Sequence, residues 1–310
     1  MDEAEPLRII CGPTGAGKSA LAFALARAHP AMIVSADSRQ IYRGFDIGTA
    51  KPTKREQRQL PHRGIDVVEP TERYSAAKWA ESARTWIDEA IAEKRTPLVV
   101  GGAGLYLRAL TDPLFDEPPL DPEKRETLDA ELGALSVDEL RRWCIELDPP
   151  RAHLGRTQLL RAITVALLSG TPITAWHARV PRAAGLSARY LVVDPGVALS
   201  ARLDERFAAM LEAGWEREVV KLVRTVPADA PAWNGTGYKW IRSAVAREIS
   251  REDALAKVGV DTRQYAKRQR TWFRHQLPAA SVTRIDPGAA DALELAERWW
   301  NATDDGGVLA

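Results

Sequence analysis

The segment G-P-T-G-A-G-K-S, from Gly12 to Ser19, constrains this chain more than any other part of its sequence. It matches the phosphate-binding pattern G-x-x-x-x-G-K-[ST] and lies between an apolar run, residues 7–11, and a helical pattern, residues 18–28. Backbone N–H groups in such a loop turn toward an anion, and the start of a helix adds the positive end of its dipole. The sequence therefore predicts a P-loop, a motif that also binds ATP, with the diphosphate-binding residues Gly12, Pro13, Thr14, Gly15, Ala16, Gly17, Lys18 and Ser19. Ser19 would supply a hydroxyl ligand to a Mg²⁺ cofactor.

Apolar runs and helical patterns alternate around this loop. Residues 31–35 and 97–100 are short runs rich in Ile, Val and Leu, and residues 75–94 place apolar side chains at three- and four-residue steps. A further run over residues 189–194 is followed by a helical pattern from 200 to 223. Apolar runs without polar alternation are typical of parallel strands that are covered on both faces. We expect an α/β fold, a P-loop NTPase-like parallel sheet with helices on both faces.

The composition changes near Thr111, where several Asp-Pro and Pro-Pro pairs follow one another. Residues 121–180 show helical patterns without strands, and the run at 189–194 returns to the sheet. We therefore predict a core domain, residues 1–112 and 186–280, interrupted by a helical insertion domain, residues 113–185. Residues 281–310 give little information and are assigned to a C-terminal tail.

The bulk composition limits the classes of partner. The chain has 43 Lys and Arg against 42 Asp and Glu, so a nucleic acid would have to bind a local basic patch. Its two cysteines have no zinc-binding spacing, which favours a reducing compartment. There is no secretion signal, and no apolar stretch approaches the roughly 20 residues that span a membrane. We expect a cytoplasmic monomer with no membrane partner.

One acidic residue follows the second predicted strand. Asp37 would lie at the carboxyl edge of the sheet, in the same crevice as the P-loop. The strand at residues 97–100, in contrast, ends in Gly101-Gly102-Ala103 and carries no carboxylate for the metal of an ordinary kinase or ATPase. From the residues alone, Asp37 is a catalytic carboxylate, a loop cap or a ligand of a metal-bound water.

Beyond the P-loop, the chain resembles the tRNA dimethylallyltransferases, also called the IPP transferase family, over roughly residues 7–275. The run D-I-G-T-A-K-P, residues 46–52, is the most specific of the shared motifs. The others are Asp37–Tyr42, Pro61–Asp66, Tyr74–Ala77, Gly101-Gly102 with Tyr106, Gly237–Lys239 and Thr262–Trp272.

The resemblance implies a reaction. In that family the P-loop holds the diphosphate of dimethylallyl diphosphate, and the exocyclic amine of the adenine 3′ of the anticodon attacks the allylic carbon. It implies that Asp37 is the general base and that Lys18 stabilises the leaving diphosphate. The helical insertion would clamp the anticodon stem-loop of tRNA. The implied tRNA-contacting residues are Asp37, Ser38, Arg39, Gln40, Ala103, Thr157, Gln158, Leu159, Leu160 and Arg161.

A basic stripe supports an RNA partner separately. Residues 262–275 contain five Lys or Arg and no acid, and four of them fall on one side of a predicted helix: Arg263, Lys267, Arg270 and Arg274. Alone, the stripe is better explained by a solvated helix face. Beside the resemblance, phosphate contact is the better interpretation, and binding should then depend on salt.

Three positions depart from the family pattern. Ala103 replaces a Thr that is thought to help hold the diphosphate; a backbone N–H could substitute, but one hydroxyl donor is lost. Leu154-Gly155-Arg156 replaces a Pro-Asn-Asp run, and Trp240 replaces an acid. Three alternatives stay open: a small-molecule P-loop kinase, an enzyme that prenylates free adenine nucleotides, and a tRNA-binding homologue with weakened catalysis.

Overall fold

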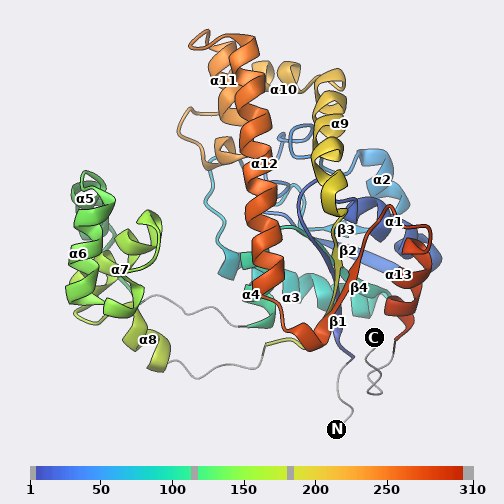
Figure 1. Ribbon diagram of the computed structural model, residues 1–310, viewed down its shortest axis with the longest axis horizontal. Coiled ribbons are helices and arrows are strands. Elements are labelled where there is room, and N and C mark those ends of the chain that lie inside the picture. The colour runs from blue at the N-terminus through green and yellow to red at the C-terminus, as the bar shows by residue number, and fades with distance from the viewer. Residues whose placement is uncertain (1–4, 113–117, 180–184, 303–310) are drawn as a thin grey trace. The chain divides into compact units, whose positions relative to one another are not determined.

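The computed structural model describes residues 5–112, 118–179 and 185–302 (Figure 1). The chain divides into two compact units, the core unit of residues 1–111 and 185–310, and the helical unit of residues 112–184. No helix in the described ranges is both long and apolar enough to cross a membrane.

The core unit is built on a parallel sheet. Six strands are present among the described residues, in the order β3-β2-β4-β1-β5-β6, and every neighbouring pair is parallel. They are β1 (Leu7–Cys11), β2 (Ala31–Ala36), β3 (His62–Arg63), β4 (Thr96–Gly101), β5 (Ala188–Val193) and β6 (Val282–Ile285). The predicted α/β fold class is confirmed.

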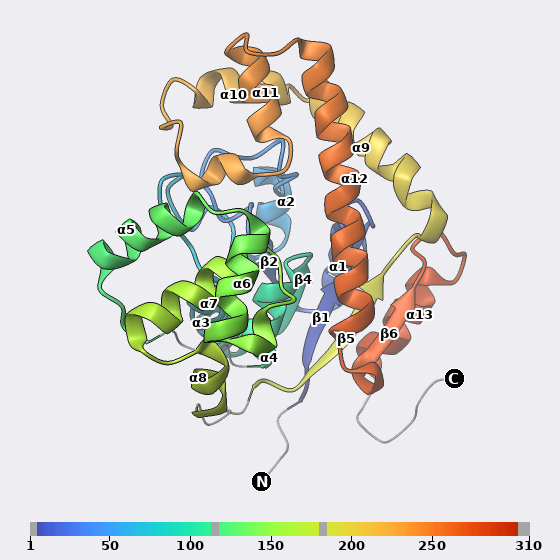
Figure 2. The same ribbon diagram turned by 60° about the vertical axis from the view of Figure 1, so that its left-hand side comes forward.

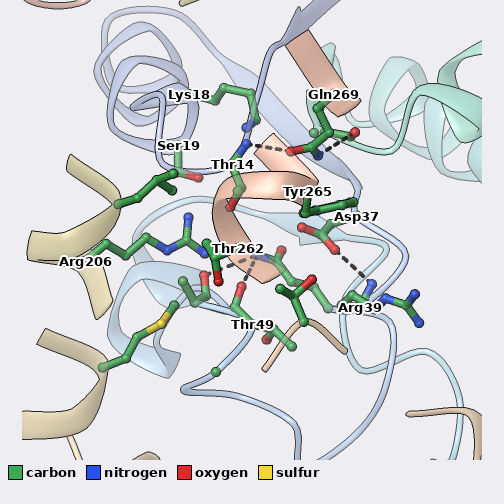
Figure 3. A pocket seen from close by; sticks show the side chains of 18 of the residues that line it. Thr14, Lys18, Ser19, Asp37, Arg39, Thr49, Arg206, Thr262, Tyr265 and Gln269 are labelled. Atoms are coloured by element: carbon green, nitrogen blue, oxygen red, sulfur yellow. Dashed lines mark hydrogen bonds between the residues drawn. The ribbon is translucent and has the colours of Figure 1, made fainter. Parts of the chain in front are cut away.

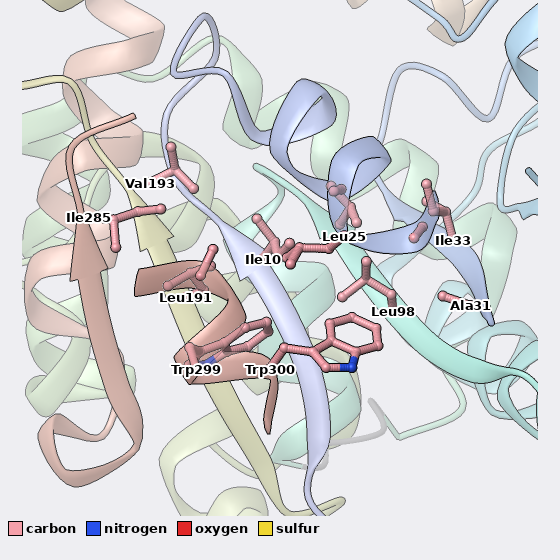
Figure 4. Packing of buried hydrophobic residues seen from close by; sticks show 14 of the residues in the cluster. Ile10, Leu25, Ala31, Ile33, Leu98, Leu191, Val193, Ile285, Trp299 and Trp300 are labelled. Atoms are coloured by element: carbon pink, nitrogen blue, oxygen red, sulfur yellow. The ribbon is translucent and has the colours of Figure 1, made fainter. Parts of the chain in front are cut away.

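The helices of the core unit, among the described residues, are α1 (Lys18–Ala28), α2 (Lys54–Gln59), α3 (Ala76–Ala92), α4 (Gly104–Thr111), α9 (Leu199–Glu212), α10 (Trp215–Leu222), α11 (Tyr238–Val245), α12 (Arg251–His275) and α13 (Ala292–Asn301). Of these, α1, α3 and α13 pack directly against strands of the sheet. On one face, Ile10, Leu98 and Leu191 pack with side chains of α1 and α13 (Figure 4). Ile9 and Val99 alternate with these residues along the strands and are also fully buried.

The long helix α12 lies beside α9 and α11 (Figure 1, Figure 2). The sequence predicts one helix over residues 200–223, but the structure has two, α9 and α10, which are separated at Gly214. Gly214 has φ 96°, a left-handed conformation that glycine adopts without the steric cost of a Cβ atom. The break allows α9 to line the crevice above the sheet while α10 packs against α9 and α11.

The C-terminal segment belongs to the core unit. Strand β6 pairs with β5, and Trp299 and Trp300 of α13 are each 4% exposed in the core. His29 of α1 also contacts Glu297 of α13 at 2.7 Å. The prediction that residues 281–310 form a tail is therefore wrong for the described part, residues 281–302. Four residues, two of them exposed, are too short a run to give a strand signal.

The helical unit has its own core. Its helices are α5 (Pro122–Gly133), α6 (Val137–Leu147), α7 (Arg156–Ser169) and α8 (Ile173–Arg179). Asp121 caps α5, and Ser136 and Glu139 form a capping box at the start of α6. Buried side chains from α5, α6, α7 and α8 pack together, among them Leu132, Leu140, Leu159, Ile163 and Ile173.

Candidate active site

The loop between β1 and α1 has the backbone that its glycines predict. Gly12, Gly15 and Gly17 have φ values of 143°, 76° and 98°, where L side chains are strained. A Cβ atom on Gly12 would lie 2.2 Å from the carbonyl oxygen of Val193, so this position also needs glycine for close packing. The loop ends at the first turn of α1, where Lys18 and Ser19 lie.

A pocket of about 130 Å³ opens at the carboxyl ends of β1, β2 and β4 (Figure 3). The segments of the core unit that line it include the Gly12–Ser19 loop, the turn after β2, residues 48–50, the end of β4, helix α9 and helix α12. The polar side chains in it include Thr14, Lys18, Ser19, Asp37, Arg39, Gln40, Arg206, Thr262, Tyr265 and Gln269. Apolar side chains of Leu203, Phe207, Met210 and Trp215 form one wall. The structure thus brings Lys18, Ser19 and Asp37 into one pocket.

Lys18 is held inside the loop. Its ammonium donates a hydrogen bond to the carbonyl oxygen of Pro13 at 2.7 Å. Burial and, to a smaller extent, the nearby Arg206 lower the pKa of Lys18 to about 8, although the charge of Asp37 acts in the opposite direction. A bound anion would stabilise the charged ammonium and offset this burial cost.

Asp37 is oriented by the backbone. Its Oδ1 accepts a hydrogen bond from the N–H of Arg39 at 2.8 Å, which fixes the carboxylate at the start of the turn after β2. The other carboxylate oxygen accepts no hydrogen bond from the described residues, and it is available to a substrate in the pocket. This arrangement is suited to a general base.

Arg206 of α9 is a pocket residue that was not among the site residues predicted from the sequence. Its side chain enters the pocket, burial lowers its pKa, and it makes no hydrogen bond or ion pair with the residues that the structure describes. A signal was present, because Leu203, Arg206, Phe207 and Met210 recur at three- and four-residue steps. A cation on the apolar stripe of a helix marks a position that faces a binding site or a buried partner.

Two residues of α12 were missed as well. Tyr265 lines the pocket beside Asp37, and burial, together with Asp37, raises its pKa to about 12 (Figure 3). Gln269 is 7% exposed and contacts the backbone at Thr14 and Gly102. With Thr262, these residues form a polar stripe at three- and four-residue steps. The five Lys and Arg of this segment indicated an RNA-contacting surface, so its polar stripe was not assigned to the pocket.

The D-I-G-T-A-K-P segment forms one side of the pocket. Lys51, whose side chain is 2% exposed, donates to the carbonyl oxygen of Tyr42 and to the carboxylates of Asp46 and Asp66, each at 2.6 Å. Glu218 of α10 accepts from the backbone N–H groups of Asp46 and Ile47, at 3.1 and 2.7 Å. These contacts hold residues 48–50 against the pocket.

Comparisons with known proteins agree with these motifs. A model of the IPP transferase family matches residues 40–276, and a model of isopentenyl transferases matches residues 5–64. This chain belongs to the IPP transferase family. It is 39% identical to a tRNA dimethylallyltransferase of Acaryochloris marina, covering 93% of this chain and 95% of that protein. It is 38% identical to one of Thermus thermophilus, covering 95% and 97%.

Solved structures show the same fold. A full-length tRNA isopentenylpyrophosphate transferase of Bacillus halodurans is 32% identical, with a TM-score of 0.66 and 94% of both chains covered. A eukaryotic dimethylallyltransferase acting on tRNA has a TM-score of 0.76 over 96% of this chain and 77% of that one. At 23% identity, the second likeness shows the fold alone.

The basic stripe of this family member is partly neutralised. Arg263 pairs with Asp204 and Arg270 with Asp194, each at 2.9 Å, whereas Lys267 is exposed and makes no ion pair with the described residues. Phosphate contact by these three side chains stays a prediction. Lys267 and Arg274, the fourth member of the stripe, are exposed and make no ion pair with the described residues.

In the helical unit, the segment Thr157–Arg161 forms the first turns of α7. Thr157, Gln158 and Arg161 are exposed, but Leu159 is 0% exposed and packs in the core of the unit. Contact of this segment with tRNA stays a prediction, but the side chain of Leu159 is not at the surface of the unit and Leu160 is only partly exposed. A straight helix cannot present five consecutive side chains to one partner, because each residue turns the direction by about 100°.

The departures from the family pattern have structural accounts. The N–H of Ala103 donates to the carbonyl oxygen of Ala36 at 3.1 Å, so this N–H is not available to substitute for the missing threonine hydroxyl. Arg156 donates to the carbonyl oxygens of Leu135 and Gly133, which ties the start of α7 to the α5–α6 connection. The indole N–H of Trp240 donates to Asp261 at 2.8 Å, which links α11 to α12.

Proposed function

We propose that this enzyme transfers a dimethylallyl group from dimethylallyl diphosphate to the exocyclic amine of the adenosine 3′ of the anticodon in tRNA. The products are N6-dimethylallyladenosine and diphosphate. The observation that carries the proposal is that one pocket holds a phosphate-binding loop with Lys18 and, beside it, Asp37 with one unengaged carboxylate oxygen. The names of the relatives, tRNA dimethylallyltransferases, support the same reaction.

The cationic part of the pocket stabilises the leaving group. As the bond between the allylic carbon and the diphosphate oxygen breaks, its electron pair stays on the diphosphate. Lys18, Arg206 and the backbone N–H groups of the loop offset that charge, and such fixed electrostatic groups commonly make the largest catalytic contribution. We assign Arg206 to this role because its guanidinium enters the pocket without a protein hydrogen-bond partner among the described residues.

The donor set of the pocket fits Mg²⁺. This ion keeps several waters and usually binds one or two protein ligands together with substrate phosphates. The hydroxyl of Ser19 would hold it, and the ion would supply further charge neutralisation at the diphosphate. No group of three or more His, Cys, Asp or Glu that could form an all-protein metal cage is found in the described part of the chain.

Asp37 acts at the nucleophile. The amine nitrogen forms the new bond to the allylic carbon and must lose one proton, which the unengaged oxygen of Asp37 accepts. The N–H of Arg39 holds the other oxygen, so the carboxylate is oriented before the substrate enters. General base catalysis of this kind typically contributes on the order of 100- to 10,000-fold.

RNA binding is proposed for surfaces near the pocket and on the helical unit. Ser38, Arg39 and Gln40 follow Asp37 in the turn after β2, and the exposed Thr157, Gln158 and Arg161 begin α7. Target bases in RNA loops are recognised unstacked, which allows the adenine to enter a pocket of this size. We place the enzyme in the cytoplasm, where its substrate tRNA is, and a monomer suffices because one chain supplies every residue named here.

Mass spectrometry of reaction products tests the proposal. Unmodified tRNA is incubated with the protein, Mg²⁺ and dimethylallyl diphosphate, and nuclease fragments are weighed. We expect the mass of one dimethylallyl group on a single anticodon-loop adenosine. Parallel reactions contain AMP in place of tRNA, or ATP in place of dimethylallyl diphosphate. Prenylated AMP without prenylated tRNA, or ATP consumption alone, would replace the proposal with one of the alternative activities.

A further inference from the structure

Gln269 joins two segments that line the pocket. It lies in the second half of α12, where its side chain is buried, and both ends of its amide bond to backbone groups. Its Oε1 accepts from the N–H of Thr14 at 2.8 Å, and its Nε2 donates to the carbonyl oxygen of Gly102 at 2.8 Å (Figure 3). One side chain therefore connects the Gly12–Ser19 loop, the end of β4 and α12.

The contacts demand a primary amide at this position. Thr14 presents a donor and Gly102 presents an acceptor, so the side chain between them must offer both an acceptor and a donor. A carboxylate lacks the donor, and a hydrocarbon lacks both. Space is also limited, because a Cβ atom on Gly102 would lie 2.4 Å from the Nε2 of Gln269. Gly102 and Gln269 are thus matched to each other.

The first of these bonds determines which way the loop faces. Because the N–H of Thr14 donates to Gln269, it is directed toward α12 and is not free for an anion. The N–H of Ala16 donates to the carbonyl oxygen of Pro13 at 3.3 Å, whereas those of Gly15 and Gly17 make no hydrogen bond to the described residues and remain to face the diphosphate. The second bond fixes the carbonyl oxygen of Gly102, which sits at the end of the strand next to β1. An unmade bond at either buried backbone group carries a desolvation cost that favours a rearranged loop.

We propose that Gln269 is a positioning residue that holds the phosphate-binding loop in the conformation that accepts the diphosphate. The proposal rests on the proposed function for the identity of the substrate. It assigns Gln269 no contact with the reacting atoms, and its effect reaches the diphosphate through the backbone of Thr14. Since α12 also carries the exposed Lys267, the same side chain links a proposed RNA-contacting helix to the loop.

The first test compares Gln269→Met with Gln264→Met, a control on an exposed glutamine of the same helix. Binding of inorganic diphosphate with Mg²⁺ is measured by calorimetry, and KM and kcat are measured for both substrates. We expect Gln269→Met to weaken diphosphate binding and raise the KM for dimethylallyl diphosphate about ten-fold, as expected for one or two lost buried hydrogen bonds. The KM for tRNA should match that of the control. Equal diphosphate affinity in the two variants would overturn the proposal.

The second test uses Gln269→Glu and pH. The introduced carboxylate can accept from Thr14 but repels the carbonyl oxygen of Gly102, whereas the protonated carboxyl can donate to it. We expect the diphosphate affinity of this variant, divided by that of wild type, to rise about ten-fold as pH falls from about 8 to about 5. Lys18, Asp37, Arg39, Arg206 and Tyr265 line the same pocket in both proteins, so their own titration largely cancels in the ratio.

The outcomes of the two tests separate the possible roles. A ratio that does not change with pH would refute the amide's role, even if Gln269→Met failed to fold. Equal losses of affinity for diphosphate and tRNA would show a structural residue only, and would also overturn the proposal. If wild type binds diphosphate but does not modify tRNA, the proposed function fails, while the comparison of the variants still decides the role of Gln269.

Discussion

The pocket of the core unit and helix α7 of the helical unit were both predicted from short contiguous motifs, yet only the first motif brings its residues to one place. In the Gly12–Ser19 loop the backbone itself curls around a point, so consecutive residues converge. In the segment Thr157–Arg161 the backbone is a regular helix, so consecutive residues diverge and Leu159 enters the core. A motif therefore locates a site closely when it lies in a turn, and only roughly when it lies on a helix.

The largest effect expected in the pocket comes from Asp37→Asn. The asparagine oxygen can still accept from the N–H of Arg39, so the turn after β2 is kept while the base is removed. We expect the single-turnover rate of transfer to tRNA to fall on the order of 100- to 10,000-fold. Asp286→Asn is a matched control, because the Oδ1 of Asp286 accepts from the N–H of Gly288 at 2.8 Å in a similar turn. A rate within two-fold of the control, taking about two-fold as insignificant beside that loss, would remove Asp37 from the chemistry.

In the helical unit the largest effect should be on stability. Leu159→Ala leaves a cavity among Leu132, Leu140 and Ile163, and a buried Leu→Ala change typically costs about 2–5 kcal/mol. Thr157→Ala, two residues earlier and exposed, should change the free energy of unfolding by less than about 0.5 kcal/mol. Hydrogen exchange of the α7 amides measures both. If Leu159→Ala were as stable as Thr157→Ala, the two faces of α7 would be assigned incorrectly.

The contrast also explains what the sequence could and could not predict. The strands and the Gly12–Ser19 loop were predictable because apolar runs and glycines act locally. Gln269 was not, because it reaches the pocket from a helix far along the chain, and helical spacing alone does not tell which face meets a cavity. Arg206 left only a partial signal, a cation on an apolar helical stripe, which does not tell a binding site from a buried partner. Strand β6 was missed because its pairing with β5 supplies the stabilisation that its four residues lack.

A smaller effect in the pocket should follow pH through Lys18. The pKa of Lys18 is about 8, so without a bound anion its ammonium loses its proton as pH rises through about 8. Above that pH, diphosphate binding requires Lys18 to take up a proton, which lowers the affinity. We expect diphosphate affinity to be constant below that pH and to fall up to about ten-fold per pH unit above it. Lys18→Met should bind more weakly, without this decline. Calorimetric titrations with inorganic diphosphate and Mg²⁺ measure both, and parallel declines in the two proteins would assign the titration to another group.

The smallest effect should come from the basic stripe of α12. The prediction tests whether Lys267, an exposed cation of this stripe without an ion pair to the described residues, contacts an RNA phosphate. Lys267→Ala should lower the slope of log affinity for tRNA against log salt by about 0.7 to 0.9, the contribution of one phosphate contact. Arg263→Ala should change it less, because that guanidinium is already paired with Asp204.

Lys257→Ala is the control, since Lys257 is exposed earlier on α12 with its ammonium 5.0 Å from the centre of the Trp240 ring. An equal change in slope for Lys257 and Lys267 would mean that tRNA senses the overall charge of the helix. A change confined to Lys267 would give α12 the kind of residue-specific contact that five consecutive residues of α7 cannot all provide.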